Sequence, residues 1–193
     1  MTDTDATTGT AAAYEELVDS LRSTFNSGRT KSRDWRTAQL RGLIRLIEEN
    51  ADELERALAE DLGRPPIEAH AADLGFTVVE IKHLLKHLDS WARPAKRRLP
   101  LTSMPGKVRV VSEPLGVAFV IAPWNYPWTI TVQEIAIALL CGNGVLLKPA
   151  SLTPRLGEEI QRAFEDAGVP QGLIRTVHGG GRSGDALTKS SAG

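Results

Sequence analysis

The first ninety residues carry apolar side chains at intervals of three and four positions, which is the spacing of helices that bury one face. The pattern predicts three helices, over residues 14–25, 33–62 and 67–91. The second helix must end at "LGRPP", because Gly63 favours termination and the pair Pro65 and Pro66 cannot continue a helix. We therefore expect residues 14–93 to form a helical segment.

The spacing changes after Pro94, where short apolar runs alternate with helical stretches. Val108–Val111 predicts a short strand, and "VAFVIA" at 117–122 predicts a strand that is buried on both faces. The elements beyond are predicted as helix 128–140, strand 145–147, helix 154–167, strand 173–177 and helix 182–189. Strands separated by helices of this length form βαβ units, so residues 94–193 should contain a parallel α/β sheet.

The composition is that of an ordinary globular chain of 193 residues, with 41% hydrophobic residues, 24% charged residues and a formal net charge of -1. This balance gives no reason to expect a nucleic acid or an anionic membrane as a partner. The local basic cluster Lys96, Arg97 and Arg98 follows Trp91 and Pro94, so we expect it to be a solvated connecting segment.

The N-terminus and the cysteine content bear on location. Residues 1–13 contain no Lys or Arg and no apolar stretch, so we expect a disordered start and not a secretory signal. The longest apolar runs, such as "IAIALLC", fall short of the ~20 residues that cross a bilayer, so no membrane span is expected. The single cysteine rules out an internal disulfide and fits a reducing compartment, which predicts a soluble, cytoplasmic protein.

Candidate nucleophiles and metal ligands are few. Cys141 follows the end of a predicted helix, where the helix dipole disfavours a thiolate, so we interpret it as a small buried hydrophobe. His83 and His87 lie one helical turn apart, but no third ligand is apparent and a solvated helix face is the better interpretation. The chain has neither a G-x-S-x-G elbow nor a P-loop, which removes the commonest hydrolase and NTPase hypotheses.

Three glycines in "VHGGGRSGDAL" follow a predicted strand and open a predicted helix. Gly179, Gly181 and Gly184 fit the spacing G-x-G-x-x-G of a dinucleotide-binding fingerprint. The fingerprint also needs an acidic residue about 20 positions later, and the sequence ends at Gly193. A flexible strand-to-helix turn explains the same glycines, so both interpretations stay open.

Asn125 and Lys148 are polar residues at the ends of two predicted strands. Pro127 suits the first position of the following helix, which makes Tyr126 the N-cap and leaves the Asn125 amide free of capping. The carboxyl ends of parallel strands share one edge of a sheet, and open α/β sheets bind ligands there. The two side chains therefore mark a candidate nucleotide site, with chance placement on the surface as the alternative.

A family resemblance rests on three segments in this order: D-L-G-R-P at 61–65, P-W-N-Y-P at 123–127 and G-N-G-V-L-L-K-P at 142–149. The stretch from Glu113 to Pro154 resembles the aldehyde dehydrogenase superfamily, and residues 24–69 look like its class 3, fatty-aldehyde-like branch. The resemblance implies a helical N-terminal segment followed by an incomplete Rossmann-like parallel sheet. It also implies NAD- or NADP-dependent oxidation of an aldehyde to a carboxylate through a cysteine thioester.

The resemblance assigns roles to residues of this chain. Asn125 matches the family's oxyanion-hole amide, and Lys148 matches the lysine that holds the adenosine ribose. Pro123 and Trp124 match positions beside the cofactor. Gly181 or Gly184 matches the turn beside the adenine, which adds a third interpretation of the glycine-rich segment.

Ser151 is an informative departure from the family pattern. Many NAD-preferring members carry a glutamate three residues after the lysine, and this carboxylate binds the ribose hydroxyls. Serine at 151 removes a charge that would repel a 2′-phosphate, so we expect NADP to be tolerated or preferred.

The family's catalytic cysteine, its general-base glutamate and its G-S-T-x-x-G loop have no match in these 193 residues. From this the sequence predicts a truncated family member that does not turn over aldehydes as a lone chain. Two alternatives are a non-catalytic partner of a full-length relative and a stand-alone dinucleotide-binding protein. A homo-oligomer is a further expected association, because an incomplete sheet exposes an edge strand.

Overall fold

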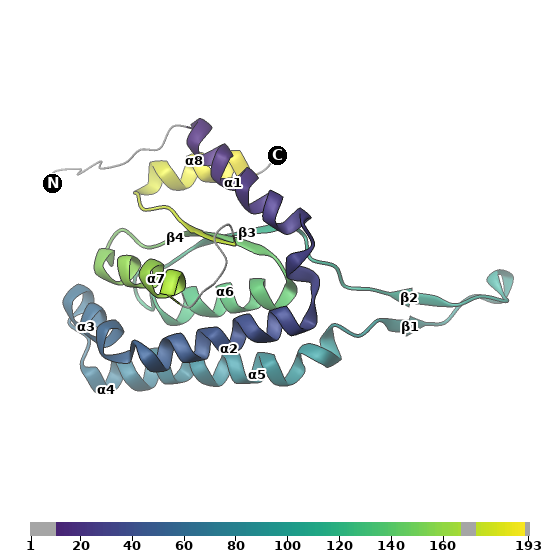
Figure 1. Cartoon of the computed structure of the whole chain (residues 1–193), viewed down its shortest axis with the longest axis horizontal. Coiled ribbons are helices and arrows are strands. Elements are labelled where there is room, and N and C mark those ends of the chain that lie inside the picture. The colour runs from purple at the N-terminus through teal and green to yellow at the C-terminus, as the bar shows by residue number, and fades with distance from the viewer. Residues whose placement is uncertain (1–10, 167–172, 192–193) are drawn as a thin grey trace.

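The computed structural model describes residues 11–166 and 173–191, and Figure 1 shows them as stacked layers around a parallel sheet. The sheet has the strand order β3-β4-β5, with bounds Val117–Ile121, Gly144–Lys148 and Ile174–Thr176. All of its pairings are parallel. The predicted α/β class with a parallel sheet is therefore confirmed.

Helices cover both faces of the sheet (Figure 1). On one face lie α1 (Ala11–Asn26) and α8 (Gly181–Ser191), which contact each other. On the other face lie α6 (Thr129–Cys141) and α7 (Pro154–Asp166). Burial from both sides explains why β4 is an uninterrupted apolar run that ends at Lys148. The prediction that the strand at 117–122 is buried on both faces was wrong, because β3 lies at the edge of the described sheet, is half-buried and ends at the exposed Ile121.

The outer helical layer contains α2 (Arg33–Glu49), α3 (Ala51–Leu62) and α5 (Phe76–Trp91). A short helix, α4 (Pro66–Glu68), and a π-helix over Ala69–Gly75 lead into α5 without a break. The prediction of one helix over 33–62 was wrong, since the chain breaks at Asn50, whose Nδ2 donates to the Leu46 carbonyl at 2.8 Å. The predicted stop at Gly63 is confirmed, because Gly63 has φ 64° and ends α3.

The start of the chain differs from the prediction. Residues 1–10 of the expected disordered segment lie outside the described residues, whereas α1 already begins at Ala11. The structure therefore corrects the boundary at 13, because Ala11–Ala13 form the first turn of α1.

A two-stranded arm extends from the body of the molecule (Figure 1). It consists of β1 (Ala95–Arg97) and β2 (Val108–Val110), which pair antiparallel. The basic cluster was predicted as a connecting segment, but Lys96 and Arg97 belong to β1, although both are exposed as expected. Val108 and Val110 are exposed on β2, and association with another chain stays a prediction.

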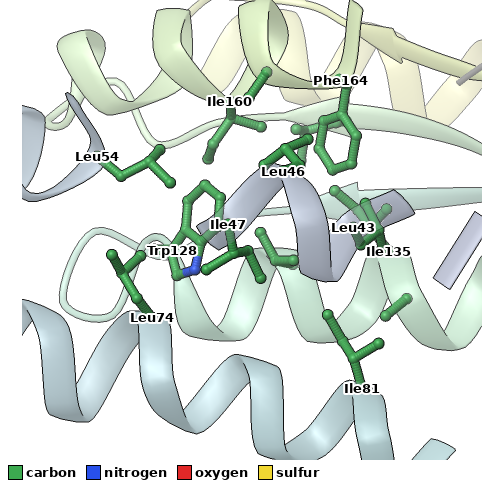
Figure 2. Close-up of a cluster of buried hydrophobic side chains, with 14 of the residues drawn as sticks. Leu43, Leu46, Ile47, Leu54, Leu74, Ile81, Trp128, Ile135, Ile160 and Phe164 are labelled. Carbon is green, nitrogen blue, oxygen red and sulfur yellow. The ribbon is translucent and has the colours of Figure 1, made fainter. Parts of the chain in front are cut away.

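Two groups of buried side chains hold the layers together. The larger lies between the sheet, α6, α7 and the outer helices, and Figure 2 shows Trp128 in it with Leu54, Ile47 and Leu74. The smaller fills the opposite face of the sheet with Tyr14, Val18, Leu21, Leu146, Val177 and Leu187. Across the described ranges, no helix is both long and apolar enough to span a membrane.

The N-terminus of α7 is capped by a carboxylate from another helix. The Asp61 carboxylate, on α3, accepts hydrogen bonds from the backbone N–H groups of Arg155 at 3.3 Å and Leu156 at 2.8 Å. A carboxylate at this end satisfies two donors that have no partner inside the helix and opposes the helix dipole. The cap also fixes where the chain re-enters regular structure after Lys148.

We expect Asp61→Ala to lower the free energy of unfolding by about 1 kcal/mol, the usual cost of losing an N-cap side chain. Urea denaturation measures this change. Glu60→Ala is the matched control, because Glu60 is exposed and only approaches Arg155 at 3.9 Å. Equal effects of the two substitutions would show that the cap does not stabilise the fold.

Candidate functional site

The two strands that lead to the predicted site residues end side by side at one edge of the sheet. Ile121, the last residue of β3, lies opposite Lys148, the last residue of β4. The next residue of the first strand, Ala122, donates its N–H to the Lys148 carbonyl at 2.9 Å. The segment that carries Asn125 therefore leaves the sheet directly beside Lys148, as the sequence predicted.

The parallel direction of the strands defines the same edge. The crossovers α6 and α7 lie on one face of the sheet, while α8 lies on the other (Figure 1). Both described crossovers therefore share one face, and α8 follows the last described strand. Open parallel α/β sheets bind ligands outside the carboxyl ends of their strands. Lys148 occupies one of those ends, and Asn125 lies in the loop that begins at the end of β3.

The Lys148 side chain is buried, with 6% of the residue exposed. Its Nζ donates a hydrogen bond of 3.3 Å to the Pro149 carbonyl. Burial lowers the pKa of Lys148 from the ordinary value of 10.5, because desolvation disfavours the ammonium form. Gly184 of α8 lies against the Lys148 stem, since a Cβ added there would be 3.6 Å from Lys148 Cδ and Cε.

The pKa of Lys148 makes a prediction about stability. The unfolded chain keeps the ordinary pKa of 10.5 and binds more protons than the folded chain between the two pKa values, so folding becomes more favourable as pH rises through that window. We expect Lys148→Met to be more stable than the wild type at pH 7, and the difference to shrink as pH approaches 10.5. Urea unfolding of both proteins at several pH values tests this, and a difference that grows with pH would contradict it.

Asn125 lies in an exposed loop between β3 and α6. Its neighbours Trp124 and Tyr126 are also exposed, and Pro123 is half-buried. The prediction that Pro127 starts the helix was wrong. The regular helix begins at Thr129, after a single turn in which the Ile130 N–H donates to the Tyr126 carbonyl at 3.2 Å.

The remaining predicted residues lie on the turn after β4 and on α8. Ser151 is exposed in the turn after β4, three residues beyond Lys148. Gly181 is exposed at the start of α8, one helical turn before Gly184. Among these residues, Gly184 lies next to Lys148. Among the described contacts, none joins Ser151 or Gly181 to Lys148.

The structure explains why one residue of the glycine-rich segment, Gly179, is a glycine. A Cβ at this position would overlap the Ser183 hydroxyl and lie 2.7 Å from the Ser183 Cβ. Ser183 is itself buried in the first turn of α8. Close packing of the turn therefore requires glycine at 179, which fits the turn interpretation and leaves the fingerprint interpretation a prediction.

Cys141 is not part of the strand-end site. The prediction that it is buried was wrong, because Cys141 is exposed and lines a cavity of about 390 Å³ together with Leu84, Leu88 and Trp91. It precedes the first residue of β4, whereas Lys148 is the last. At roughly 3.3 Å per strand residue, the two lie at opposite ends of the sheet.

The rings of His83, His87 and Trp91 lie next to one another on α5. Their ring centroids are 4.2 Å apart, and the His87 ring stacks on Trp91 at 5.2 Å. Within 11–166 and 173–191, no group of three or more His, Cys, Asp or Glu side chains could hold a metal ion. The expectation of a solvated face fits His83, which is exposed, more closely than His87, which is half-buried.

Three residues near Asn125 were not predicted from the sequence to belong to the site. Arg64 donates to the Asn125 carbonyl at 2.7 Å and pairs with the buried Asp73 at 2.6 Å, and Asp73 in turn accepts from Thr129 at 2.9 Å. One signal was available, since Asp73 and Thr77 lie four residues apart among apolar positions of a predicted helix. Polar side chains on a buried helix face need partners, and this pattern pointed to an internal polar network.

Comparison with known proteins supports the resemblance. The model of the aldehyde dehydrogenase family matches residues 3–192. The chain is 38% identical over 164 residues to the chloroplastic aldehyde dehydrogenase family 3 member I1 of Arabidopsis thaliana, covering 85% of this chain and 30% of the relative. It is 33% identical over 168 residues to family 3 member B1 of Rattus norvegicus, covering 87% of this chain and 36% of that protein.

Solved structures agree with these matches. Staphylococcus aureus AldH in a substrate-bound state superposes with a TM-score of 0.86 at 30% identity, covering 90% of this chain and 38% of that one. An indole-3-acetaldehyde dehydrogenase in complex with NAD+ superposes with a TM-score of 0.82 at 29% identity, covering 92% and 36%. This chain spans about a third of the length of its curated relatives. The chain belongs to the aldehyde dehydrogenase family, and its similarity to family 3 members agrees with the class 3 branch.

Proposed function

We propose that the edge formed by Asn125 and Lys148 is the cofactor-facing and oxyanion-stabilising part of an NAD(P)-dependent, aldehyde-oxidising site. The observation that carries the proposal is the buried Lys148 ammonium at the end of β4, beside the loop of Asn125 and against Gly184. Membership of the aldehyde dehydrogenase family supports it. So does the NAD+ complex of the structurally similar indole-3-acetaldehyde dehydrogenase.

The residues present fit a dinucleotide. An ammonium group has three N–H donors, and Lys148 Nζ gives one hydrogen bond to Pro149, which leaves donors for ribose hydroxyls. Gly184 keeps the space beside the lysine stem free of a side chain. When bound, NAD(P)+ supplies the hydride acceptor.

Asn125 carries the second role. Its carboxamide N–H groups are donors that can stabilise the negative oxygen formed when a nucleophile adds to an aldehyde carbonyl. Such a donor typically contributes about 10²- to 10³-fold in rate, provided that it is fixed before the charge develops. The exposed position of Asn125 leaves its amide accessible to a substrate.

Ser151 sets the cofactor preference in this proposal. We expect Ser151→Glu to weaken NADP binding by about tenfold or more while weakening NAD binding less, because a carboxylate beside the ribose repels a 2′-phosphate. Isothermal titration of both cofactors measures the two affinities. Ser151→Gln is the matched control, since it has the size of glutamate without its charge, and an equal loss with both substitutions would contradict the electrostatic explanation.

Turnover by the 193-residue polypeptide tests the proposed division of roles. Its one cysteine, Cys141, lies at the opposite end of the sheet from Asn125, so we propose that this polypeptide binds cofactor without oxidising aldehydes. The assay combines purified polypeptide with a medium-chain aldehyde and either cofactor. Measurable turnover would overturn the proposed inactivity, and absence of cofactor binding would overturn the proposed site.

The two alternatives predict different outcomes of the same experiments. A stand-alone dinucleotide-binding protein using the glycine-rich turn would bind cofactor with no loss on Lys148→Ala. A non-catalytic partner would bind a full-length relative and show no affinity for cofactor. Tenfold weaker cofactor binding by Lys148→Ala favours the proposed site over both.

A further inference from the structure

We propose that Arg64 is a positioning residue for Asn125, and that buried Asp73 holds Arg64 in the required orientation. The contacts stand on the structure alone, while their catalytic meaning rests on the proposed role of the Asn125 amide. The arrangement assigns a task to "LGRPP" beyond ending α3, because its arginine returns to the loop 61 residues further along the chain.

The Arg64 guanidinium makes three contacts with separate parts of its fork. Nη1 lies 2.6 Å from the Asp73 carboxylate, and Nη2 donates to the Asn125 carbonyl at 2.7 Å. Cζ lies 4.8 Å from the centroid of the Tyr126 ring, within the range of a cation–π contact. One side chain thus binds two consecutive residues of the loop while its charge is neutralised on the opposite side.

Burial makes this contact stronger than a surface ion pair. The Asp73 side chain has no exposed area and that of Arg64 has 10%. A fully buried carboxylate without a cation is costly, so the pair is held together even though the loop it serves is exposed. Glu68 also approaches Arg64, at 3.8 Å, but half of its side chain is exposed and it is not expected to orient the guanidinium.

Asp73, on the π-helix, also binds the residue at the end of the same loop. Thr129, the first residue of α6, donates to the Asp73 carboxylate at 2.9 Å, and Thr77 donates to the Asp73 carbonyl at 2.7 Å. At the start of the loop, the Ala122 N–H is bound to the Lys148 carbonyl at 2.9 Å. The loop is therefore tied at its beginning to the sheet, at its end to the π-helix, and at its middle by Arg64.

The contact from Arg64 in the middle of the loop is the one that can position an oxyanion donor. Trp124, Asn125 and Tyr126 are all exposed, so burial does not hold this part of the loop in place. An amide contributes fully to oxyanion stabilisation only when its position is fixed to about 0.5 Å. The hydrogen bond from Arg64 to the peptide carbonyl of Asn125 supplies that constraint at the residue itself.

Arg64→Lys separates positioning from folding. Lysine keeps the positive charge beside Asp73, but its single nitrogen cannot occupy both places that Nη1 and Nη2 hold, and it lacks the planar face over Tyr126. We expect the melting temperature to change by only a few degrees. We expect the ¹⁵N order parameters of the Asn125 and Tyr126 amides to fall from about 0.85 to below about 0.6.

Relaxation measurements on the ¹⁵N-labelled 193-residue chain give these values without cofactor, so they stay informative if the proposed function fails. Glu68→Gln is the matched control and should leave the loop unchanged. If Arg64→Lys does not fold, the pair Arg64→Met with Asp73→Asn takes its place, because it removes the clamp without leaving a buried charge. Order parameters at the wild-type value in a folded variant of either kind would overturn the proposal.

Discussion

Replacing Trp128 with alanine is expected to lower the free energy of unfolding by about 3 to 5 kcal/mol, as is usual for removal of a large buried aromatic side chain. Trp128 is fully buried, and Figure 2 shows its ring among side chains from α3, α2 and the π-helix. Truncation would leave a cavity where the outer helices meet the start of α6. Denaturation in urea, monitored by circular dichroism, measures the change.

Trp128→Phe provides the comparison. The indole Nε1 of Trp128 is buried without a hydrogen-bond partner, so phenylalanine removes an unsatisfied polar group while keeping most of the ring volume. We expect the free energy of unfolding to fall by roughly 1 kcal/mol or less. The smaller ring buries less apolar surface and leaves a small cavity, but removal of the unsatisfied N–H group partly offsets this cost. Equal losses for phenylalanine and alanine would contradict the interpretation that ring volume, and not the indole N–H, stabilises this layer.

Replacing Arg64 with methionine is expected to cost about 3 to 5 kcal/mol, since it leaves the Asp73 carboxylate buried without its cation. This loss should exceed that of Arg64→Lys, which keeps the charge. Adding Asp73→Asn to Arg64→Met should recover most of the lost stability, because asparagine removes the buried charge and still accepts from Thr129. Thermal and urea unfolding of the single and double variants measure the recovery, and additive losses would show that the two side chains are not coupled.

Much of the sheet and its edge was predictable from the sequence. Val117–Ile121 and Gly144–Lys148 are short apolar runs between helical patterns, a composition typical of strands in a sheet covered by helices, although only β4 is buried throughout. The second run ends at Lys148 and the first leads into the loop of Asn125, so the placement of Lys148 beside this loop followed from parallel pairing. Each of these strands is defined by neighbouring residues in the sequence, and the spacing of apolar residues detects such local patterns.

The features that periodicity missed have physical reasons. The helices on both sides of Asn50 bury apolar faces in the same core, so the apolar spacing continues through the break. The surroundings of Cys141 were also hidden, because α6 carries apolar residues on every side, including the exposed Ile130 and Ile137. Such a helix has no polar face from which exposure can be deduced.

Contacts between distant segments lie beyond any local pattern. Asp61 caps a helix 95 residues away, and Arg64 binds the Asn125 carbonyl across 61 residues. The sequence shows an acidic residue before "LGRPP" and an arginine within it, and both types are common at helix ends. Only the packing of α3 beside α7 and of the π-helix beside α6 reveals what they bind.

A crystal structure of the 193-residue chain grown with saturating NADP tests the proposed site most directly. We expect the adenosine ribose to lie within hydrogen-bond distance of Lys148 Nζ, at the carboxyl ends of β3 and β4. Cofactor bound instead in the cavity lined by Leu84, Leu88 and Trp91, or at the glycine-rich turn away from Lys148, would contradict it.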